Sequence, residues 1–265
     1  MKKVFISFVI IAISLSSLSS CITMMLLNQS IKDKAYDERG CSNSVFSVAK
    51  GKTVKFTRAN IYGSYSDPQK YSKRYGEEKY GTGWYFGSNC FDCDGFNSSE
   101  RYQFGECDSV RIKYGGKVVS GYRLLTAEEW RFLLFEREAS TIGGVENARF
   151  VIGQVSYKRG LIIFPDNYKH PRGVPEIFGA NDQSGLVLDN SFDEREWEKM
   201  ENAGAVFLIE PCKGGPCPSR YLTSSKNNAG EVGFLSFETV IFHYVKVEWL
   251  PNSFKGLARL VVDNK

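Results

Sequence analysis

Apolar and polar residues alternate along two short segments after residue 44. Residues 45–48 and 53–57 show this pattern and are rich in Val, Phe and Thr, and Lys50, Gly51 and Lys52 lie between them. A period of two is typical of strands with one buried face, and a glycine between two such strands favours a tight turn. We therefore predict a β-hairpin at the start of the globular part of the chain.

The clearest helix begins at Thr126. Thr126 and Glu129 have the spacing of a capping box, in which the threonine hydroxyl accepts from the amide of the third helical residue and the glutamate reaches back to the threonine amide. Trp130, Leu133 and Leu134 follow at helical spacing and would share one apolar face. This pattern predicts a short helix that packs against the core.

A second short helix is predicted after residue 190. Ser191 and Glu194 have the same capping-box spacing, and Trp197 and Met200 would form the buried stripe of the helix. Gly204 is placed to end it, because glycine readily adopts the left-handed conformation found just past a helix C-terminus.

Several other segments have the composition of strands. Residues 149–157 and 161–164 would pair around a turn at residues 158–160, and residues 205–209 would form another buried strand. Late strands of an antiparallel sheet are predicted at residues 221, 233–237, 240–247 and 257–262. The whole pattern predicts an α+β fold, mostly antiparallel sheet with two short helices and long loops.

Residues 60–116 are rich in Tyr, Gly, Ser and Asn and show little periodicity. This composition favours long loops, which often carry binding surfaces. Trp84 and Tyr85 lie in the glycine-rich segment 81–87 and are our candidates for aromatic contacts with a ligand. The alternative is that these two side chains hold the loop in place.

The first residues of the chain have the layout of a secretory signal. Lys2 and Lys3 precede an apolar stretch over residues 4–18, and small residues follow. The sequence Leu-Ser-Ser-Cys that ends at Cys21 resembles the lipobox of bacterial lipoproteins, in which the cysteine receives a lipid. Because Ile22 is not the aspartate that retains some lipoproteins at the inner membrane, the outer membrane is favoured.

This interpretation divides the chain into a signal peptide over residues 1–20, a tether over residues 21–44 and one globular domain over residues 45–265. The membrane would be a partner only through the lipid anchor. The alternatives are plain secretion and an uncleaved anchor, because apolar residues continue to residue 27 and the stretch could span a bilayer. In each case the globular part is exported.

Six cysteines follow Cys21, and an even number in an exported chain favours disulfide bonds. Free thiols, a zinc site and a redox pair are the alternatives, although no second C-x-x-C completes the usual zinc spacing. Six cysteines allow 15 pairings, and the sequence does not choose among them. The disulfide candidates are Cys41, Cys90, Cys93, Cys107, Cys212 and Cys217.

Composition limits the functional classes further. The net charge is +4, and Lys2 and Lys3 in the leader account for two of these charges, so the remaining surplus is too small to favour nucleic acid. His170 and His243 are the only histidines, and the sequence holds no nucleotide-binding or hydrolase motif. The sequence therefore favours a non-catalytic protein, and we expect no metal and no cofactor.

Five segments, in the same order, resemble a paralogous group of proteins from gut anaerobic bacteria. They are GYRLLTAEEWRFLL, RFVIGQVSYKRGLIIFPD, SFDEREWEKMENAGAVFL, YLTSS and GLARLVV, and they cover about residues 120–262. On these segments the chain is similar to the Fibrobacter major paralogous domain and, more distantly, to the formylglycine-generating (sulfatase-modifying) enzymes. The resemblance implies a C-type-lectin-like fold, but it says little about activity because one fold hosts many functions.

Three features depart from these families. Leu222 stands where the paralogous group has a tryptophan. Residues 218–265 contain no cysteine, whereas the formylglycine-generating enzymes hold copper with a cysteine pair near the C-terminus. Glu248, with Pro251 and Asn252, matches only loosely the carboxylate–Pro–Asn motif of calcium-dependent lectins, and we interpret Glu248 as a strand residue that points to solvent.

Three functional hypotheses follow. The first is an envelope lipoprotein whose lectin-like domain is a non-catalytic binding module for a glycan or a protein. The second is an oxidoreductase of the formylglycine-generating type, and the third is a structural surface protein that assembles with other copies.

Lipidation of Cys21 is directly testable. In cells fed a palmitate analogue, the wild-type chain should take up the label and sediment with membranes, because each buried methylene contributes about 0.8 kcal/mol to anchoring. Cys21→Ala should lose the label, and Cys41→Ala should keep it. A labelled Cys21→Ala variant would refute the lipid anchor.

Overall fold

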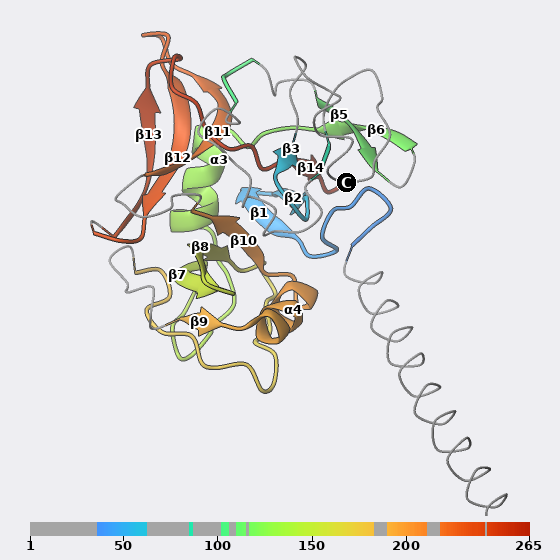
Figure 1. The fold of residues 1–265 in the computed structure, drawn as a ribbon, viewed down its shortest axis with the longest axis vertical. Helices are drawn as coiled ribbons and strands as arrows, with labels where there is room; N and C mark the ends of the chain where they lie inside the picture. Colours follow the sequence, from blue (N-terminus) through green and yellow to red (C-terminus); the bar gives the residue numbers. More distant parts are fainter. Residues whose placement is uncertain are drawn as a thin grey trace, which may run out of the picture.

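The computed structural model describes residues 36–62, 85, 86, 102–105, 110–114, 117–182, 190–210, 218–241 and 243–265. The leader and Cys21 lie outside these residues. The described chain is dominated by β-sheet and contains two short helical regions, which confirms the predicted α+β class (Figure 1).

The elements in chain order are β1 (Phe46–Ala49), β2 (Lys52–Phe56), β3 (Ile61–Tyr62), β4 (Tyr85–Phe86), β5 (Val110–Tyr114), β6 (Lys117–Tyr122), α3 (Ala127–Arg131), the π-helical segment η3 (Phe132–Glu136), β7 (Phe150–Val155), β8 (Lys158–Ile163), β9 (Ser191–Phe192), α4 (Glu194–Asn202), β10 (Val206–Ile209), β11 (Ser219–Lys226), β12 (Val232–Glu238), β13 (Tyr244–Leu250) and β14 (Val261–Asp263).

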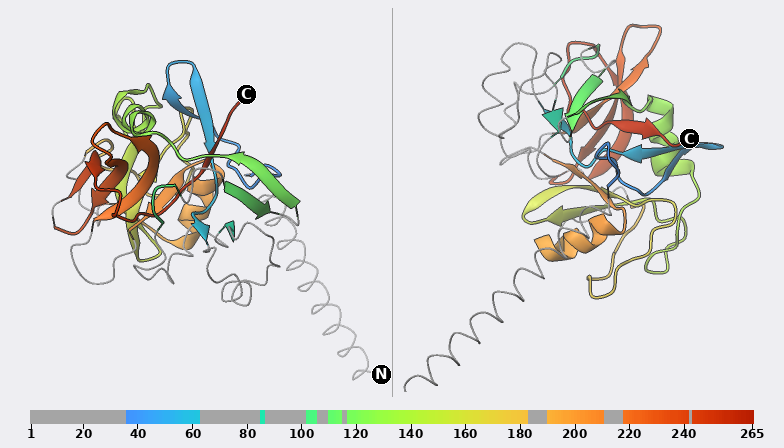
Figure 2. Two further views of the ribbon diagram at one scale, coloured as in Figure 1. Left: turned by 90° about the horizontal axis from the view of Figure 1, so that it is seen from above. Right: turned by 90° about the vertical axis from the view of Figure 1, so that its right-hand side faces the viewer.

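The described strands form four sheets, with strand orders β1-β2-β14, β10-β8-β7-β9, β11-β12-β13 and β3-β4-β5-β6. Neighbouring strands are antiparallel except in the pairs β4–β5 and β7–β9. β14 pairs with β2, so the C-terminal strand lies beside the first hairpin (Figure 2).

The first hairpin and the late strands follow the sequence pattern in part. β1 and β2 form the predicted hairpin, with Phe46 opposite Val54. The strand predicted over residues 240–247 begins only at Tyr244, because His243 has a φ of 43°, which is not an extended conformation. The strand predicted over residues 257–262 is also wrong in part, since β14 begins at residue 261 and pairs with β2 instead of the late sheet.

The hairpin of β7 and β8 is present, but its predicted turn at residues 158–160 is wrong. Ser156 and Tyr157 make the turn, with φ values of 45° and 69°, the positive values that tight hairpin turns favour. Gly160 instead lies inside β8, where β10 approaches closely. A Cβ at residue 160 would lie 2.2 Å from the carbonyl oxygen of Leu208, so this glycine is needed for strand pairing.

The predicted capping box of the first helix is confirmed. The Glu129 amide donates to Thr126 Oγ1 at 3.0 Å, and the Thr126 amide donates to the Glu129 carboxylate at 2.9 Å. The helix then widens into η3, where the Arg137 amide donates to the Phe132 carbonyl. The predicted apolar face is buried and consists of Trp130, Leu133 and Leu134.

Helix α4 also forms, but the predicted capping box at Ser191 and Glu194 is wrong. Asp193 is the N-cap and Glu196 its partner, with reciprocal hydrogen bonds of 2.8 Å. Ser191 is used by β9, which pairs with β7, so the helix can begin only after this strand. Trp197 and Met200 are buried as predicted, and Gly204 follows the helix with a φ of 96°.

The main hydrophobic core contains both helix tryptophans. The Trp130 ring lies 5.7 Å from that of Phe56, and the Trp197 ring lies 5.6 Å from that of Phe207, measured between centroids. The two helices therefore pack against different strands of one shared core.

Helix α3 packs against one face of β12 and β13 (Figure 1). Gly233 permits this approach, because a Cβ at residue 233 would lie 3.0 Å from the Cβ of Ala127. The strand residues on this face join the main core and include Tyr221, Leu235, Phe237 and Val245. On the other face, Leu222 and Phe234 belong to a second, smaller cluster.

Residues 36–44 were predicted to be tether, but they are folded. Tyr36 pairs with Ser42, and Cys41 pairs with Thr57 at the end of β2. Asp37 Oδ1 accepts hydrogen bonds from the amides of Arg39 and Cys41, which shapes this turn. The folded part therefore includes Tyr36 and the residues after it. No helix of the described chain is long and apolar enough to cross a membrane.

Burial of Trp130 should dominate the stability of this packing. Its side chain is buried and its Nε1 has no hydrogen-bond partner among the described residues. We expect Trp130→Ala to lower the free energy of unfolding by about 3–5 kcal/mol, and Trp130→Phe to cost less because it keeps most of the apolar contact and breaks no hydrogen bond. Denaturant titration of the full chain in detergent would measure both changes.

The exposed Ile241 serves as the control, and Ile241→Ala should change the free energy of unfolding by no more than about 0.5 kcal/mol. Equal losses for Trp130→Ala and Ile241→Ala would contradict the packing of α3.

Candidate functional site

Most residues that the sequence marks as candidates lie outside the described structure. Tyr85 is in β4, where its backbone pairs with Tyr62 of β3 and Lys113 of β5. Outside the described residues lie Cys21, Trp84, Cys90, Cys93, Cys107, Cys212 and Cys217.

Cys41 is described, and it is a buried free thiol rather than half of a disulfide. Burial, with a smaller contribution from the negative charge of Asp37, raises the pKa of the Cys41 thiol to about 12. The thiol is therefore protonated at neutral pH and unreactive, and Cys41 packs as a small apolar side chain.

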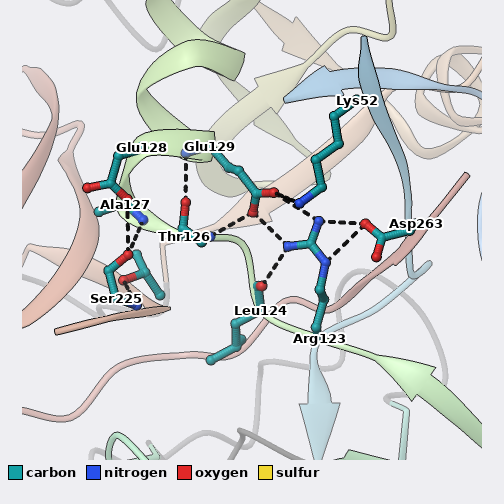
Figure 3. Close-up of polar contacts among 10 residues, drawn as sticks. Lys52, Arg123, Leu124, Thr126, Ala127, Glu128, Glu129, Ser225 and Asp263 are labelled. Carbon is teal, nitrogen blue, oxygen red and sulfur yellow. Dashed lines mark hydrogen bonds and ion pairs between the residues drawn. The ribbon is translucent and has the colours of Figure 1, made fainter. Parts of the chain in front are cut away.

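Charged side chains meet at the N-terminus of α3 (Figure 3). Arg123 donates to both carboxylate oxygens of Glu129, at 2.6 and 2.9 Å, and Lys52 Nζ lies 2.7 Å from the same carboxylate. Arg123 also donates to Asp263 Oδ1 at 2.7 Å. The network thus joins the first hairpin, helix α3 and the C-terminal strand.

This network is saturated, which argues for a structural role. Burial alone would raise the pKa of Glu129, but its bonds from Arg123, Lys52 and the Thr126 amide outweigh burial and lower that pKa below its ordinary value. A carboxylate that already accepts from several donors is a poor general base, because a proton would have to displace them.

An open cavity of about 330 Å³ lies beside this network. Val48 and Ala49 of β1 line one side, and Arg131, Phe132 and Glu136 of the α3–η3 segment line the other. The nearby Glu128 accepts a hydrogen bond from Ser225 Oγ at 3.2 Å. The cavity combines carboxylates with an arginine but has no buried polar group that lacks a partner.

A buried carboxylate at Glu210 was missed by the sequence analysis. Burial raises the pKa of Glu210, and Thr239 donates to it through both its hydroxyl and its amide. Glu238 is also buried and accepts from the amides of Val240 and Ile241. These bonds fix the turn that follows β12 and suit a structural role.

A different kind of site lies on the face of β11, β12 and β13 that points away from α3. Arg220, Ser236 and Lys246 are directly opposite one another in the strand register, so their side chains share this face. Tyr244 and Glu248 flank Lys246 at alternate positions of β13 and share it too. With Phe254 of the following loop, these residues form what we call the Arg220 surface: Arg220, Ser236, Tyr244, Lys246, Glu248 and Phe254.

The charges of the Arg220 surface are arranged between two aromatic rings. The Arg220 guanidinium carbon lies 5.2 Å from the Phe254 ring centroid, and Lys246 Nζ lies 4.8 Å from that of Tyr244. Glu248 lies between the cations, 2.8 Å from Lys246 Nζ and 3.8 Å from Arg220 Nε. The surface therefore offers aromatic, cationic and anionic groups together.

Arg220 differs from the other arginines that lie close to the core. Arg259 donates to Asn60 and to three backbone carbonyls, and Arg123 donates to two carboxylates. The Arg220 side chain makes no hydrogen bond within the described chain, and its Nε is buried without a partner. The buried Nε faces Glu248 at 3.8 Å, so only the two Nη groups, which make no hydrogen bond within the described chain, are candidates for donation to a ligand.

Glu248 was predicted to be a strand residue, and this is confirmed, but it does not simply point to solvent. Its side chain is only 19% exposed and is held by Lys246. Burial would raise the pKa of Glu248, but the bonds from Lys246 and Ser236 and the charge of Arg220 lower it overall. The alternation of side chains along residues 244–248 was the sequence signal that indicated a strand. That Glu248 lies near Arg220 follows only from the pairing register of β11, β12 and β13.

The network of Arg123, Lys52 and Glu129 predicts that the free energy of unfolding depends on pH. We expect Glu129→Gln to lower the free energy of unfolding by about 2 kcal/mol near pH 7, because charge-assisted hydrogen bonds from Arg123 and Lys52 are weakened. The stabilisation by the wild-type carboxylate is fully present above its ordinary pKa of 4.5 and is lost as pH falls through the lowered folded-state pKa.

The measurement is denaturant titration of both chains from pH 7 down to pH 3. The difference between them should shrink below about pH 4.5. Glu128→Gln is the matched control. Glu128 is the exposed neighbour of Glu129, and among the described residues its carboxylate accepts a hydrogen bond only from Ser225. A pH-independent difference, or an equal loss in the control, would contradict a stabilising role of the network around Glu129.

No family model, curated protein or solved structure was found to match the chain. Within the described residues, no group of three or more His, Cys, Asp or Glu side chains could hold a metal ion. The functional argument therefore rests on the chain's own geometry, in which the Arg220 surface carries a guanidinium that makes no hydrogen bond within the described residues.

Proposed function

We propose that the chain is an exported envelope lipoprotein, anchored through Cys21, whose globular domain is a C-type-lectin-like module that binds a glycan without catalysing a reaction. The basic and apolar leader that ends in Leu-Ser-Ser-Cys supports the anchor. The sheet-dominated fold, with two short helices that bury Trp130 and Trp197, is compatible with the lectin-like class.

The Arg220 surface is the observation that carries this proposal. Glycans present C–H faces that pack against aromatic rings and hydroxyls that both donate and accept hydrogen bonds. Phe254 is 39% exposed, Arg220 and Lys246 are donors, and Glu248 is an acceptor. The surface therefore places an exposed apolar ring beside hydrogen-bond donors and an acceptor, the groups that a sugar ring and its hydroxyls would contact.

Binding is favoured over catalysis by the condition of the titratable groups. Glu129 is saturated by donors, and the buried Glu210 is held by Thr239. His170 bonds within its own loop, with Nε2 2.9 Å from the Pro175 carbonyl oxygen. These contacts assign each of these side chains a structural role.

Glycan binding should depend on the exposed ring of Phe254. We expect the detergent-solubilised full chain to bind members of a glycan array. Phe254→Ala should weaken that binding about tenfold, because loss of an aromatic contact that is buried in the complex would cost about 1–2 kcal/mol. Phe178→Ala is the control, because Phe178 is even more exposed but lies in a loop before β9.

Binding that is equally weak in both phenylalanine variants would place the glycan site elsewhere. Absence of binding to every glycan on the array, by a chain with the wild-type circular dichroism spectrum, would contradict the proposed function itself.

A further inference from the structure

Building on the proposed function, we infer that the Arg220 surface selects acidic saccharides, with the guanidinium of Arg220 binding a carboxylate of the sugar. This assigns a ligand class and a specificity-determining residue to the surface.

The first argument is the hydrogen-bonding state of Arg220. A guanidinium carries five N–H donors in a planar fork that matches a carboxylate. The Arg220 side chain is only 21% exposed, yet it makes no hydrogen bond within the described chain. Within the described chain the guanidinium has only the 3.8 Å ion pair with Glu248 and the contact with the Phe254 ring, so a ligand oxygen that accepts from its Nη groups would add hydrogen bonds that the fold does not supply.

The second argument is the position of Arg220. Its stacking on Phe254 restrains the guanidinium plane, so little side-chain entropy remains to be lost on binding. Its neighbour Glu248 lies 2.8 Å from Lys246 Nζ and forms only a longer ion pair, of 3.8 Å, with Arg220 Nε. The guanidinium is therefore held in place, and its Nη donors make no hydrogen bond within the described chain.

The third argument is charge. Glu238 lies on the same face, opposite Tyr244, so two carboxylates balance the two cations, but Glu238 is fully buried and accepts from the amides of Val240 and Ile241. Lys246 is half exposed, so positive charge lies nearer to solvent than the Glu238 carboxylate does. Such a surface attracts an anion and discriminates against a neutral ligand of the same shape.

The fourth argument is the set of groups around the cation, which favours a sugar acid over a simple anion. Glu248 can accept from a hydroxyl next to the bound carboxylate, since its side chain is 19% exposed. Phe254 offers an exposed apolar edge to a ring. A uronic acid combines the carboxylate, hydroxyls and C–H face that match these groups.

The test is calorimetric titration of the full chain in detergent with a short oligogalacturonate and with its methyl ester, which has the same ring but no charge. We expect the acid to bind about tenfold or more tightly than the ester. A hydrogen bond to a charged group contributes about 1.5–3 kcal/mol, and about 1.4 kcal/mol corresponds to tenfold in affinity. Arg220→Ala should remove that preference, and Arg220→Lys should restore only part of it, because lysine keeps the charge but lacks the fork. Arg195 is an exposed arginine on α4 and provides the control, so Arg195→Ala should bind the acid as the wild type does.

Several outcomes would overturn the inference. Equal affinity for the acid and the ester would show that the surface does not discriminate by the charge of the ligand. The proposed glycan-binding function would still stand if Phe254→Ala weakened the binding of both. Unchanged acid preference in Arg220→Ala would exclude this residue. Equally tight binding of a polyglutamate peptide would show recognition of any carboxylate polymer instead of a saccharide. If neither the array nor oligogalacturonate bound, the proposed function would fail together with the inference.

Discussion

The packing of α3 against β12 and β13 decides which side of their sheet can meet a ligand. Trp130 is buried in the main core, and Gly233 lets the helix backbone approach the sheet. Because side chains alternate along a strand, burial of Leu235 and Phe237 on this side places Arg220, Ser236 and Lys246 on the other. The second cluster around Leu222 and Phe234 then covers only part of that other face.

Much of the local structure could be predicted from the sequence, because its signals are short in range. The capping box at Thr126 and the hairpin of β1 and β2 each depend on residues that are close in the chain. Errors arose where a distant partner decides. Ser191 is used by β9 against β7, which moves the cap of α4 to Asp193, and Gly160 serves the approach of β10 instead of a turn.

The candidate site was much less predictable. Nothing in the residues next to Arg220 distinguishes it from other strand arginines, and its partners Lys246 and Phe254 become neighbours only through the pairing of three strands. Glu248 was noticed, but only through a loose motif match. Cys41 was expected to form a disulfide because cysteines in exported chains usually pair, and its burial as a free thiol depends on tertiary packing that no cysteine count contains. The aromatic pair at Trp84 and Tyr85 remains a prediction.

The most direct test of this account is hydroxyl-radical footprinting of the full chain, read by mass spectrometry, because it reports which side chains reach solvent. The account predicts rapid oxidation of Phe254, which is 39% exposed, and protection of Trp130 and Trp197, which are 1% and 2% exposed, although tryptophan is intrinsically the more reactive residue. Oxidation of Trp130 at the rate of Phe254 would show that α3 does not cover the sheet, and the assignment of an outer face to Arg220 would then be wrong.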